Sequence, residues 1–179
     1  RAGRALHGHA TAVLADALAR ARAEQPGLVR LCAAMTREQG RMWLATNGGL
    51  SIIEENRIFN LSGLISDRLR AALCDKRGNI WLATLDHGVL VIPASAISGR
   101  TDTAIIRRSL VHLSESRGLA SNFAYNLAED KRGNIWIATF RAGLSKFSFD
   151  SGTGLSGVFS NYSSRNGLAY DQVWTVYVD

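Results

Sequence analysis

Short runs of apolar residues, separated by turn-forming residues, recur along the chain from residue 41 onward. Between residues 124 and 162 these runs are rich in β-branched and aromatic residues, or they alternate between apolar and polar positions, as strands of a sheet do. The intervening segments hold Gly, Asp and Asn residues that favour turns. This pattern predicts four strands, at Ala124–Glu129, Ile135–Thr139, Leu144–Phe149 and Val158–Tyr162.

The preceding part of the chain shows the same order of runs. It predicts strands at Leu69–Cys74, Ile80–Thr84, Val89–Ile92 and Leu110–Leu113. This second group spans more residues because of a polar insertion over residues 94–108, for which we expect a loop or a short helix.

A tryptophan motif repeats with these strands. It occupies Arg41–Thr46, Asn79–Thr84 and Asn134–Thr139, and a glycine precedes each copy. A Gly-Leu pair lies 18 residues before the second and third tryptophans, and Asp75–Trp81 is identical to Asp130–Trp136. Such self-similarity at intervals of a few tens of residues is typical of repeat architectures.

Four antiparallel strands in a unit of roughly 40 to 50 residues match a β-propeller blade. A leucine-rich repeat would be shorter, and a helical repeat would lack the strand-rich tryptophan segments. The sequence therefore predicts an all-β chain, a propeller fragment of about three to four four-stranded blades, with each tryptophan as a packing anchor between neighbouring sheets. We assign the blades to residues 41–62, 63–117, 118–166 and, in part, 167–179.

The fourth unit begins at Gly167-Leu168, and the chain ends six residues before the tryptophan that this unit would contain. We therefore expect a fragment. Three blades and part of a fourth are fewer than most propellers use, which predicts an open arc with exposed sheet edges. Such edges would be covered by other blades of the parent propeller or by self-association.

Residues 1–40 fit the repeat poorly. The stretch Ala10–Gln25 is rich in alanine and other helix-forming residues, and Pro26-Gly27 follows it as a stop signal. Its apolar residues share one helical face, at Val13, Leu14, Ala17 and Leu18. We favour a short N-terminal helix here, with a divergent blade edge as the alternative.

Composition narrows the functional classes. The chain has 179 residues, 46% of them hydrophobic, and a net charge of +6. Its basic residues are scattered, with no basic stripe interleaved with aromatic residues, so we expect no nucleic-acid binding. No apolar run approaches the roughly 20 residues that span a bilayer, and no signal-peptide pattern is visible, so we expect no membrane contact by this segment. We also expect no metal and no cofactor, because the histidines and cysteines form no metal-binding cluster.

The third unit resembles the two-component regulator propeller repeat. The resemblance is carried by Gly118–Asn122, Leu127–Thr139 and Gly143–Phe147, which follow the family pattern Gly-Leu-Pro-x-Asn, Glu-Asp, Gly-Asn-Leu-Trp-Ile-Gly-Thr and Gly-Leu-x-Arg-Phe. It extends in weaker form over residues 41–179. The departures are conservative for a strand: Ile65, Ala120 or Ala169 replaces the proline, and alanine replaces the glycine before threonine.

The resemblance implies a function. Repeats of this family build periplasmic sensor propellers of membrane-anchored regulators, whose cytoplasmic outputs include histidine kinases and diguanylate cyclases. It therefore implies a non-catalytic, ligand-sensing module of a signal-transduction regulator, located in the periplasm. Oligosaccharides are ligands of some members, so a small-molecule or oligosaccharide ligand is implied here.

A propeller usually binds its ligand at one end of the central channel, where loops of several blades meet. If the strands run as predicted, loops between second and third strands share that end with the links into each blade. The candidate ligand-binding residues on these segments are Asp86, His87, Arg141, Asn122 and Asp171, with Asn47, Ser66, Asp67, Ser121 and Tyr170 nearby in sequence. We favour Arg141, which could pair with an anion, and His87, which could donate or accept a hydrogen bond.

An enzyme is less favoured. The sequence contains no nucleophile elbow, no phosphate-binding glycine loop and no metal-ligand cluster. Asp86 and His87 are adjacent, so on a strand they would point to opposite faces and a dyad would require a turn. The alternatives are a protein–protein interaction scaffold and, with less support, a propeller-based lyase or hydrolase.

Overall fold

The computed structural model describes residues 32–35, 41–54, 57–64, 66, 68–152 and 154–179. All of them belong to one unit, Leu31–Asp179, which is distinct from Arg1–Arg30. The predicted N-terminal helix lies outside the described residues.

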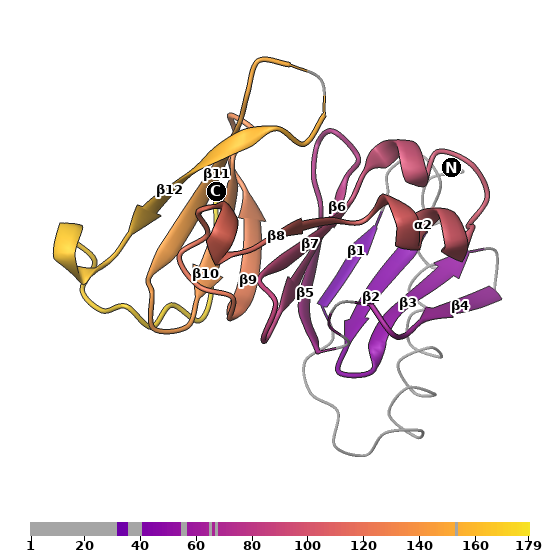
Figure 1. The fold of residues 1–179 in the computed structure, drawn as a ribbon, viewed down its shortest axis with the longest axis horizontal. Helices are drawn as coiled ribbons and strands as arrows, with labels where there is room; N and C mark the ends of the chain where they lie inside the picture. Colours follow the sequence, from indigo (N-terminus) through magenta and orange to yellow (C-terminus); the bar gives the residue numbers. More distant parts are fainter. Residues whose placement is uncertain (1–31, 36–40, 55–56, 65, 67, 153) are drawn as a thin grey trace, which may run out of the picture. The chain divides into compact units, whose positions relative to one another are not determined.

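The described chain folds into three antiparallel sheets of four strands (Figure 1). Within each sheet the strands follow one another in sequence order. The first sheet contains β1 Cys32–Met35, β2 Met42–Thr46, β3 Gly49–Glu54 and β4 Arg57–Leu61. The second contains β5 Leu69–Cys74, β6 Ile80–Thr84, β7 Val89–Ile92 and β8 Val111–Leu113. The third contains β9 Ala124–Glu129, β10 Ile135–Thr139, β11 Leu144–Phe149 and β12 Gly157–Tyr162.

This architecture confirms the predicted all-β fold of four-stranded blades. The first sheet, however, begins with β1, upstream of residue 41, and β1 pairs with β2. No strand forms in residues 167–179, where the repeat places the start of another blade. The first strand of a blade forms its ladder with the second, and the chain ends before the segment that would supply the second strand.

The second sheet is buried on both faces. Ile80 and Leu82 of β6 join a hydrophobic cluster with the first sheet, whereas Trp81 and Ala83 join a cluster with the third sheet. Successive side chains of a strand point to opposite faces, so a continuous apolar run such as Ile-Trp-Leu-Ala lets β6 pack against both neighbours. The sheets are therefore held together by alternate residues of the same strands.

The tryptophans of the first two units are packing anchors, as predicted for all three units. Trp43 and Trp81 are fully buried, Trp43 in the cluster of the first and second sheets and Trp81 in that of the second and third. Trp136 lies on the face of β10 opposite Ile135 and Ile137, which pack toward the second sheet, and it is only partly buried.

An aspartate fixes the tryptophan in two of the three sheets. Asp75 accepts hydrogen bonds from the Asn79 backbone and side chain and from Trp81 Nε1, each at 2.8 Å. Asp130 makes the same three contacts, at 2.8, 2.7 and 3.0 Å. In the first unit Arg37 stands at the equivalent position of the sequence. The buried Nε1–H of Trp43 has no acceptor among the described residues.

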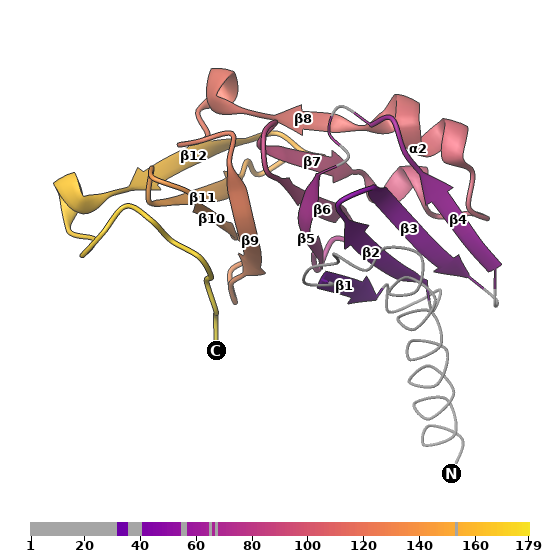
Figure 2. The ribbon, with the colours of Figure 1, turned by 90° about the horizontal axis from the view of Figure 1, so that it is seen from below.

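The insertion after β7 packs against the first sheet. It contains the short 3-10 turn η1 Ala94–Ala96 and the helix α2 Thr103–Ser109, which lies near β4 in both ribbon views (Figures 1 and 2). Ile97 and Ile106 join the cluster between the first and second sheets. The buried Arg41 guanidinium donates to Glu54 at 2.7 Å and to the Ile97 carbonyl at 2.5 Å, which ties the insertion to the first sheet.

Glycines make the close approaches between strands at the turns after β6 and β10. A Cβ added to Gly143 would lie 2.0 Å from the Tyr162 carbonyl oxygen, and one added to Gly88 would lie 2.4 Å from that of Leu113. Both residues also have a positive φ, 81° and 77°, which disfavours any side chain.

We predict that Gly143→Ala destabilises the protein by about 2–3 kcal/mol, because it combines a backbone clash with an unfavourable φ. Thermal unfolding would show this as a fall in Tm of several degrees. Gly152→Ala is the matched control, since no atom lies within 4 Å of its added Cβ. Equal Tm values for the two variants would contradict the close approach at Gly143.

The Asp130 contacts predict a pH dependence of stability. Burial tends to raise the pKa of Asp130, but hydrogen bonds from Asn134 and Trp136 outweigh it and lower the pKa from 3.8 to about 2. A carboxyl group with a lowered folded-state pKa stabilises the fold above its unfolded pKa, and this contribution is lost as the pH falls from about 4 to about 2.

We therefore expect Asp130→Asn to lower the stability by about 1–2 kcal/mol at pH 7 and by much less at pH 3. The measurement is the Tm difference between variant and parent at the two pH values. Asp179→Asn, which changes an exposed carboxylate, serves as the control. Its Tm difference from the parent should not shrink between pH 7 and pH 3. A Tm difference that stays constant with pH would argue against the Asp130 network as the cause.

Candidate functional site

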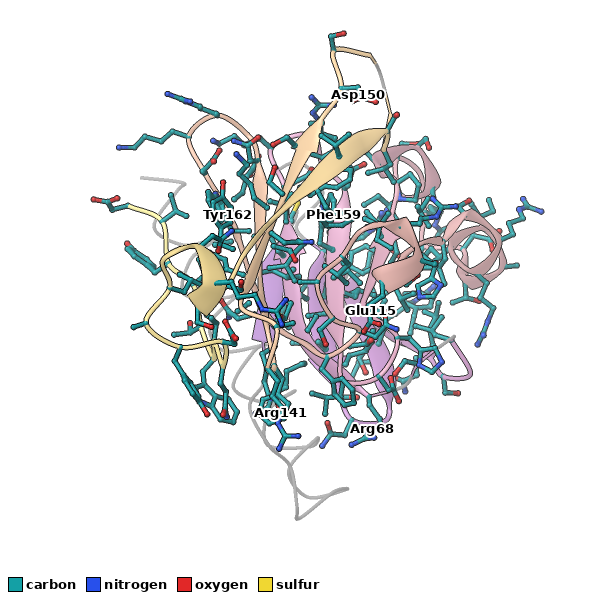
Figure 3. All side chains as sticks on the ribbon, turned by 60° about the vertical axis from the view of Figure 1, so that its left-hand side comes forward. Arg68, Glu115, Arg141, Asp150, Phe159 and Tyr162 are labelled. Atoms are coloured by element: carbon teal, nitrogen blue, oxygen red, sulfur yellow. The ribbon has the colours of Figure 1, made fainter. Side chains whose placement is uncertain are left out.

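One end of the sheets gathers the segments that the sequence marks as candidates. Because the strands alternate in direction, the β2–β3, β6–β7 and β10–β11 turns share an end with the links that lead into β5 and β9. We call this the loop end; it comprises residues 46–49, 62–64, 66, 68–69, 84–88, 114–125 and 139–143, together with 163–174. Figure 3 shows Arg68 and Arg141 at this end and Asp150, from the β11–β12 turn, at the opposite end.

Repeated residues at the loop end are used for structure. The Thr84 and Thr139 hydroxyls donate to the Gly88 and Gly143 carbonyls at 3.0 and 2.7 Å, which closes each turn. The Gly88 N–H donates to the Asn122 carbonyl, and the Gly143 N–H donates to the Asp171 carbonyl, both at 2.7 Å. Each turn is thereby clamped to the link that follows its blade.

Two of the predicted site residues hold these links. The Asn122 side chain accepts from the Glu115 N–H at 3.0 Å. The Asp171 carboxylate accepts from the Ser164 N–H at 2.5 Å and from its hydroxyl at 2.9 Å, and the backbone bond is the main cause of a lowered Asp171 pKa. These oxygens are thus engaged within the links themselves.

Asp86 and His87 lie together with Ser66 and Arg68. Asp86 accepts from the Ser66 hydroxyl at 2.5 Å and lies 4.0 Å from the Arg68 guanidinium. Its Oδ1 lies 3.0 Å from His87 Nδ1, without the alignment of a hydrogen bond. Burial tends to raise the pKa of Asp86, but the contacts with His87 and Ser66 outweigh it and lower the pKa.

Arg141 has an unusual backbone. Its φ is 65°, and it is the only described residue other than glycine with a positive φ. The side chain is exposed, and its guanidinium carbon lies 4.8 Å from the centre of the Phe140 ring. An arginine with a left-handed backbone conformation costs conformational energy. Because such strained residues cluster at functional sites, Arg141 is a candidate functional residue.

Sequence reasoning missed an aromatic cluster at the same end. Tyr125, Phe140 and Trp174, which we call the aromatic triad, have ring centres 5.7 Å (Tyr125–Phe140), 5.0 Å (Tyr125–Trp174) and 5.9 Å (Phe140–Trp174) apart. The Arg70 guanidinium lies 5.4 Å from the centre of the Tyr125 ring. One signal was available: Arg70, Tyr125 and Trp174 are each the seventh residue after the glycine of a Gly-Leu pair, and they differ in type.

A shift in strand register explains how two of these side chains are presented. In the second sheet Leu69 pairs with Thr84 and Ala71 with Ala83, which leaves Arg70 as an extra residue. In the third sheet Ala124 pairs with Thr139 and Asn126 with Ala138, which leaves Tyr125 as an extra residue. Such β-bulges change the direction of a side chain and are frequent next to functional sites.

The remaining described candidates lie on other segments of the loop end. Asn47 and Tyr170 are exposed, Ser121 is buried and accepts from the Phe123 N–H at 3.1 Å, and Asp67 lies outside the described residues. Within the described residues, no group of three or more His, Cys, Asp or Glu side chains is placed to hold a metal ion. A search of that same part of the chain found no helix with the length and hydropathy of a membrane span.

The third unit matches a family model, that of the two component regulator propeller, over residues 118–141. This stretch contains the link into β9 together with β9 and β10, so the resemblance is confirmed where its motifs are strongest. No curated protein sequence matches the chain.

Several solved structures share this fold. The extracellular domain of BT4673 from B. thetaiotaomicron, described as a hybrid two component system, has a TM-score of 0.54 and 22% identity over 82% of this chain and 21% of its own. Another structure of that domain, described as part of a one component system, has a TM-score of 0.54 and 18% identity. The match covers 66% of this chain and 17% of that structure. An inactive virginiamycin B lyase from Staphylococcus aureus with quinupristin has a TM-score of 0.52 and 14% identity. The match covers 78% of this chain and 44% of the lyase.

This chain thus spans less than half the length of each of these structures. At such identities the likeness establishes the fold: a portion of a β-propeller that resembles the extracellular domains of two-component systems.

The left-handed backbone of Arg141 predicts opposite effects of glycine at two equivalent turn positions. We expect Arg141→Gly to be more stable than Arg141→Ala by about 1 kcal/mol, because glycine relieves the unfavourable φ. Asp86 occupies the same turn position without a positive φ, so Asp86→Ala should be more stable than Asp86→Gly. Chemical unfolding of the four variants tests this. Arg141→Ala at least as stable as Arg141→Gly would refute the strain.

Proposed function

We propose that this chain is part of a ligand-sensing β-propeller of a membrane-anchored signal-transduction regulator, and that it binds without catalysing a reaction. The observation that carries this proposal is a separation of tasks among residues at the loop end. The repeated Thr and Gly residues make the turns and clamps, whereas side chains at equivalent positions differ, as Asp86 and Arg141 do. Variation among equivalent side chains at the loop end is what selective recognition requires.

The comparisons support the biological setting. The match of residues 118–141 to the two component regulator propeller, together with a fold shared with extracellular domains of such systems, favours a sensor exposed to the periplasm or the cell exterior. In this proposal the membrane anchor and the signalling output belong to other parts of the parent protein.

The side chains of the loop end suit recognition. They include exposed or half-exposed arginines, a carboxylate, an imidazole and aromatic rings within a few residues of one another. These groups can hydrogen-bond, pair with charge and stack, which is how binding sites for polar small molecules obtain orientation and specificity. The fold is shared with a lyase, but at 14% identity that likeness carries no argument about a reaction.

A thermal-shift assay with neutral and acidic oligosaccharides tests this function. We expect at least one to raise the Tm by several degrees at about a hundredfold excess over its dissociation constant, with no change in the mass of the ligand. Arg141→Ala should abolish the shift. Arg132→Ala, which removes an exposed arginine at the opposite end, should retain it.

Other outcomes identify the alternatives. Time-dependent conversion of a saccharide that His87→Ala abolishes would establish an enzyme and overturn the proposal. Stabilisation by a protein partner alone, with no small-molecule effect, would instead support an interaction scaffold.

A further inference from the structure

We propose that the aromatic triad and the arginines packed against it bind an anionic ligand that contains a ring, such as an acidic sugar or an aromatic acid. The inference rests on the proposed function, because it assigns ligand chemistry to the same loop end. It also places the contacts on β5, β9, the β10–β11 turn and the segment after β12, where sequence reasoning singled out only Arg141.

The first step is that Arg70 and Tyr125 are not needed for packing. As the extra residues of two register shifts, they have no partner in the strand ladders. Neither belongs to the hydrophobic clusters that join the sheets, which use Leu69 and Ala124 at the neighbouring positions. The same kind of shift at the same point of two blades places both side chains alike.

The second step is that the triad offers ring surface to a ligand. The side chain of Trp174 is 51% exposed, whereas Trp43 and Trp81 are fully buried. The segment that carries it is held in place, since the Val173 N–H donates to the Thr139 carbonyl and the Val176 N–H donates to Asn126 Oδ1, both at 3.2 Å. Rigid, half-exposed aromatic rings supply contact area at a low entropic cost.

The third step is that the arginines lack acidic partners. Arg70 and Arg141 each stack on a ring of the triad. Among the residues that the structure describes, no carboxylate lies within ion-pair distance of either guanidinium, in contrast to Arg41 and Arg68. Stacking leaves the in-plane N–H donors of a guanidinium available to a carboxylate or a sulfate, and each of these two groups stacks on a ring of the same triad.

The fourth step concerns competing charge. The described carboxylates of the loop end are already engaged: Asp86 with Ser66 and His87, Glu115 with the Asn122 N–H at 2.7 Å, and Asp171 with Ser164. None of these carboxylates lies within ion-pair distance of Arg70 or Arg141, so both guanidinium groups bring unpaired positive charge to the triad. An anion bound there would be attracted without displacing an internal acidic partner.

Ring stacking and anion binding together define the ligand class. A neutral sugar could stack on Trp174 but would leave both arginines unsatisfied, and a simple anion would leave the rings bare. An acidic sugar and an aromatic acid share the required chemistry, a ring that bears an acidic group. A titration that compares their affinities distinguishes between these two ligand classes.

The test uses the full chain, titrated with digalacturonate, the neutral galactose disaccharide, benzoate and inorganic sulfate. Calorimetry and tryptophan fluorescence would follow binding. We expect digalacturonate or benzoate to bind at least about tenfold more tightly than both the neutral disaccharide and sulfate, with affinity falling as salt rises. The tighter of the two acids identifies the source.

Substitutions locate the site. Trp174→Ala, Arg70→Ala and Arg141→Ala should each weaken binding of the favoured acid by about tenfold or more. Arg77→Ala is the matched control and should leave binding unchanged, because Arg77 makes a similar ring contact, 4.0 Å from the centre of Phe149, at the opposite end of the sheets. Circular dichroism would show that each variant keeps the fold.

Two results would overturn the inference. One is that neither acid binds more tightly than the neutral disaccharide. The other is that Trp174→Ala and Arg70→Ala bind the favoured acid as the parent does. If a neutral oligosaccharide binds and only Arg141→Ala abolishes its binding, ligand sensing at the loop end stands while the ligand chemistry proposed here fails.

Discussion

The structure depends on packing both faces of a small sheet at once. A four-stranded sheet with apolar residues on two faces cannot bury them alone, so each sheet requires a neighbour. β6 shows this most clearly, because Ile80 and Leu82 serve one neighbour while Trp81 and Ala83 serve the other. The tryptophan supplies the largest buried surface of this strand, and Asp75 satisfies its one polar atom in a buried setting.

This requirement also separates scaffold from site. Positions that recur between units are used by the buried clusters, the aspartate network and the clamped turns, so they carry no information about a ligand. Side chains at the loop end, on turns and at the bulged positions of inner strands, differ between units. A repeat architecture can in this way keep one fold while its binding residues change, since the two sets of residues hardly overlap.

Much of the fold followed from sequence, because each strand is a short apolar run between strong turn signals. The predicted bounds of the strands from Leu69 to Phe149 agree with the structure, except that β8 begins one residue later. The site was less predictable. Tyr125, Phe140 and Trp174 meet only through a register shift and a contact between segments far apart in sequence. Nor could sequence show that the side chains of Asn122 and Asp171 hold the links in place through hydrogen bonds to Glu115 and Ser164.

The extra residue in β5 and β9 has a consequence for how such proteins diversify. A side chain outside both the hydrogen-bonded ladder and the buried clusters can be exchanged at little cost in folding free energy, as the arginine, tyrosine and tryptophan at this point of three successive units illustrate. The second and third repeats then each contribute one mutable side chain to a common surface. Homologues could acquire new specificities one substitution at a time, without compensating changes in the core.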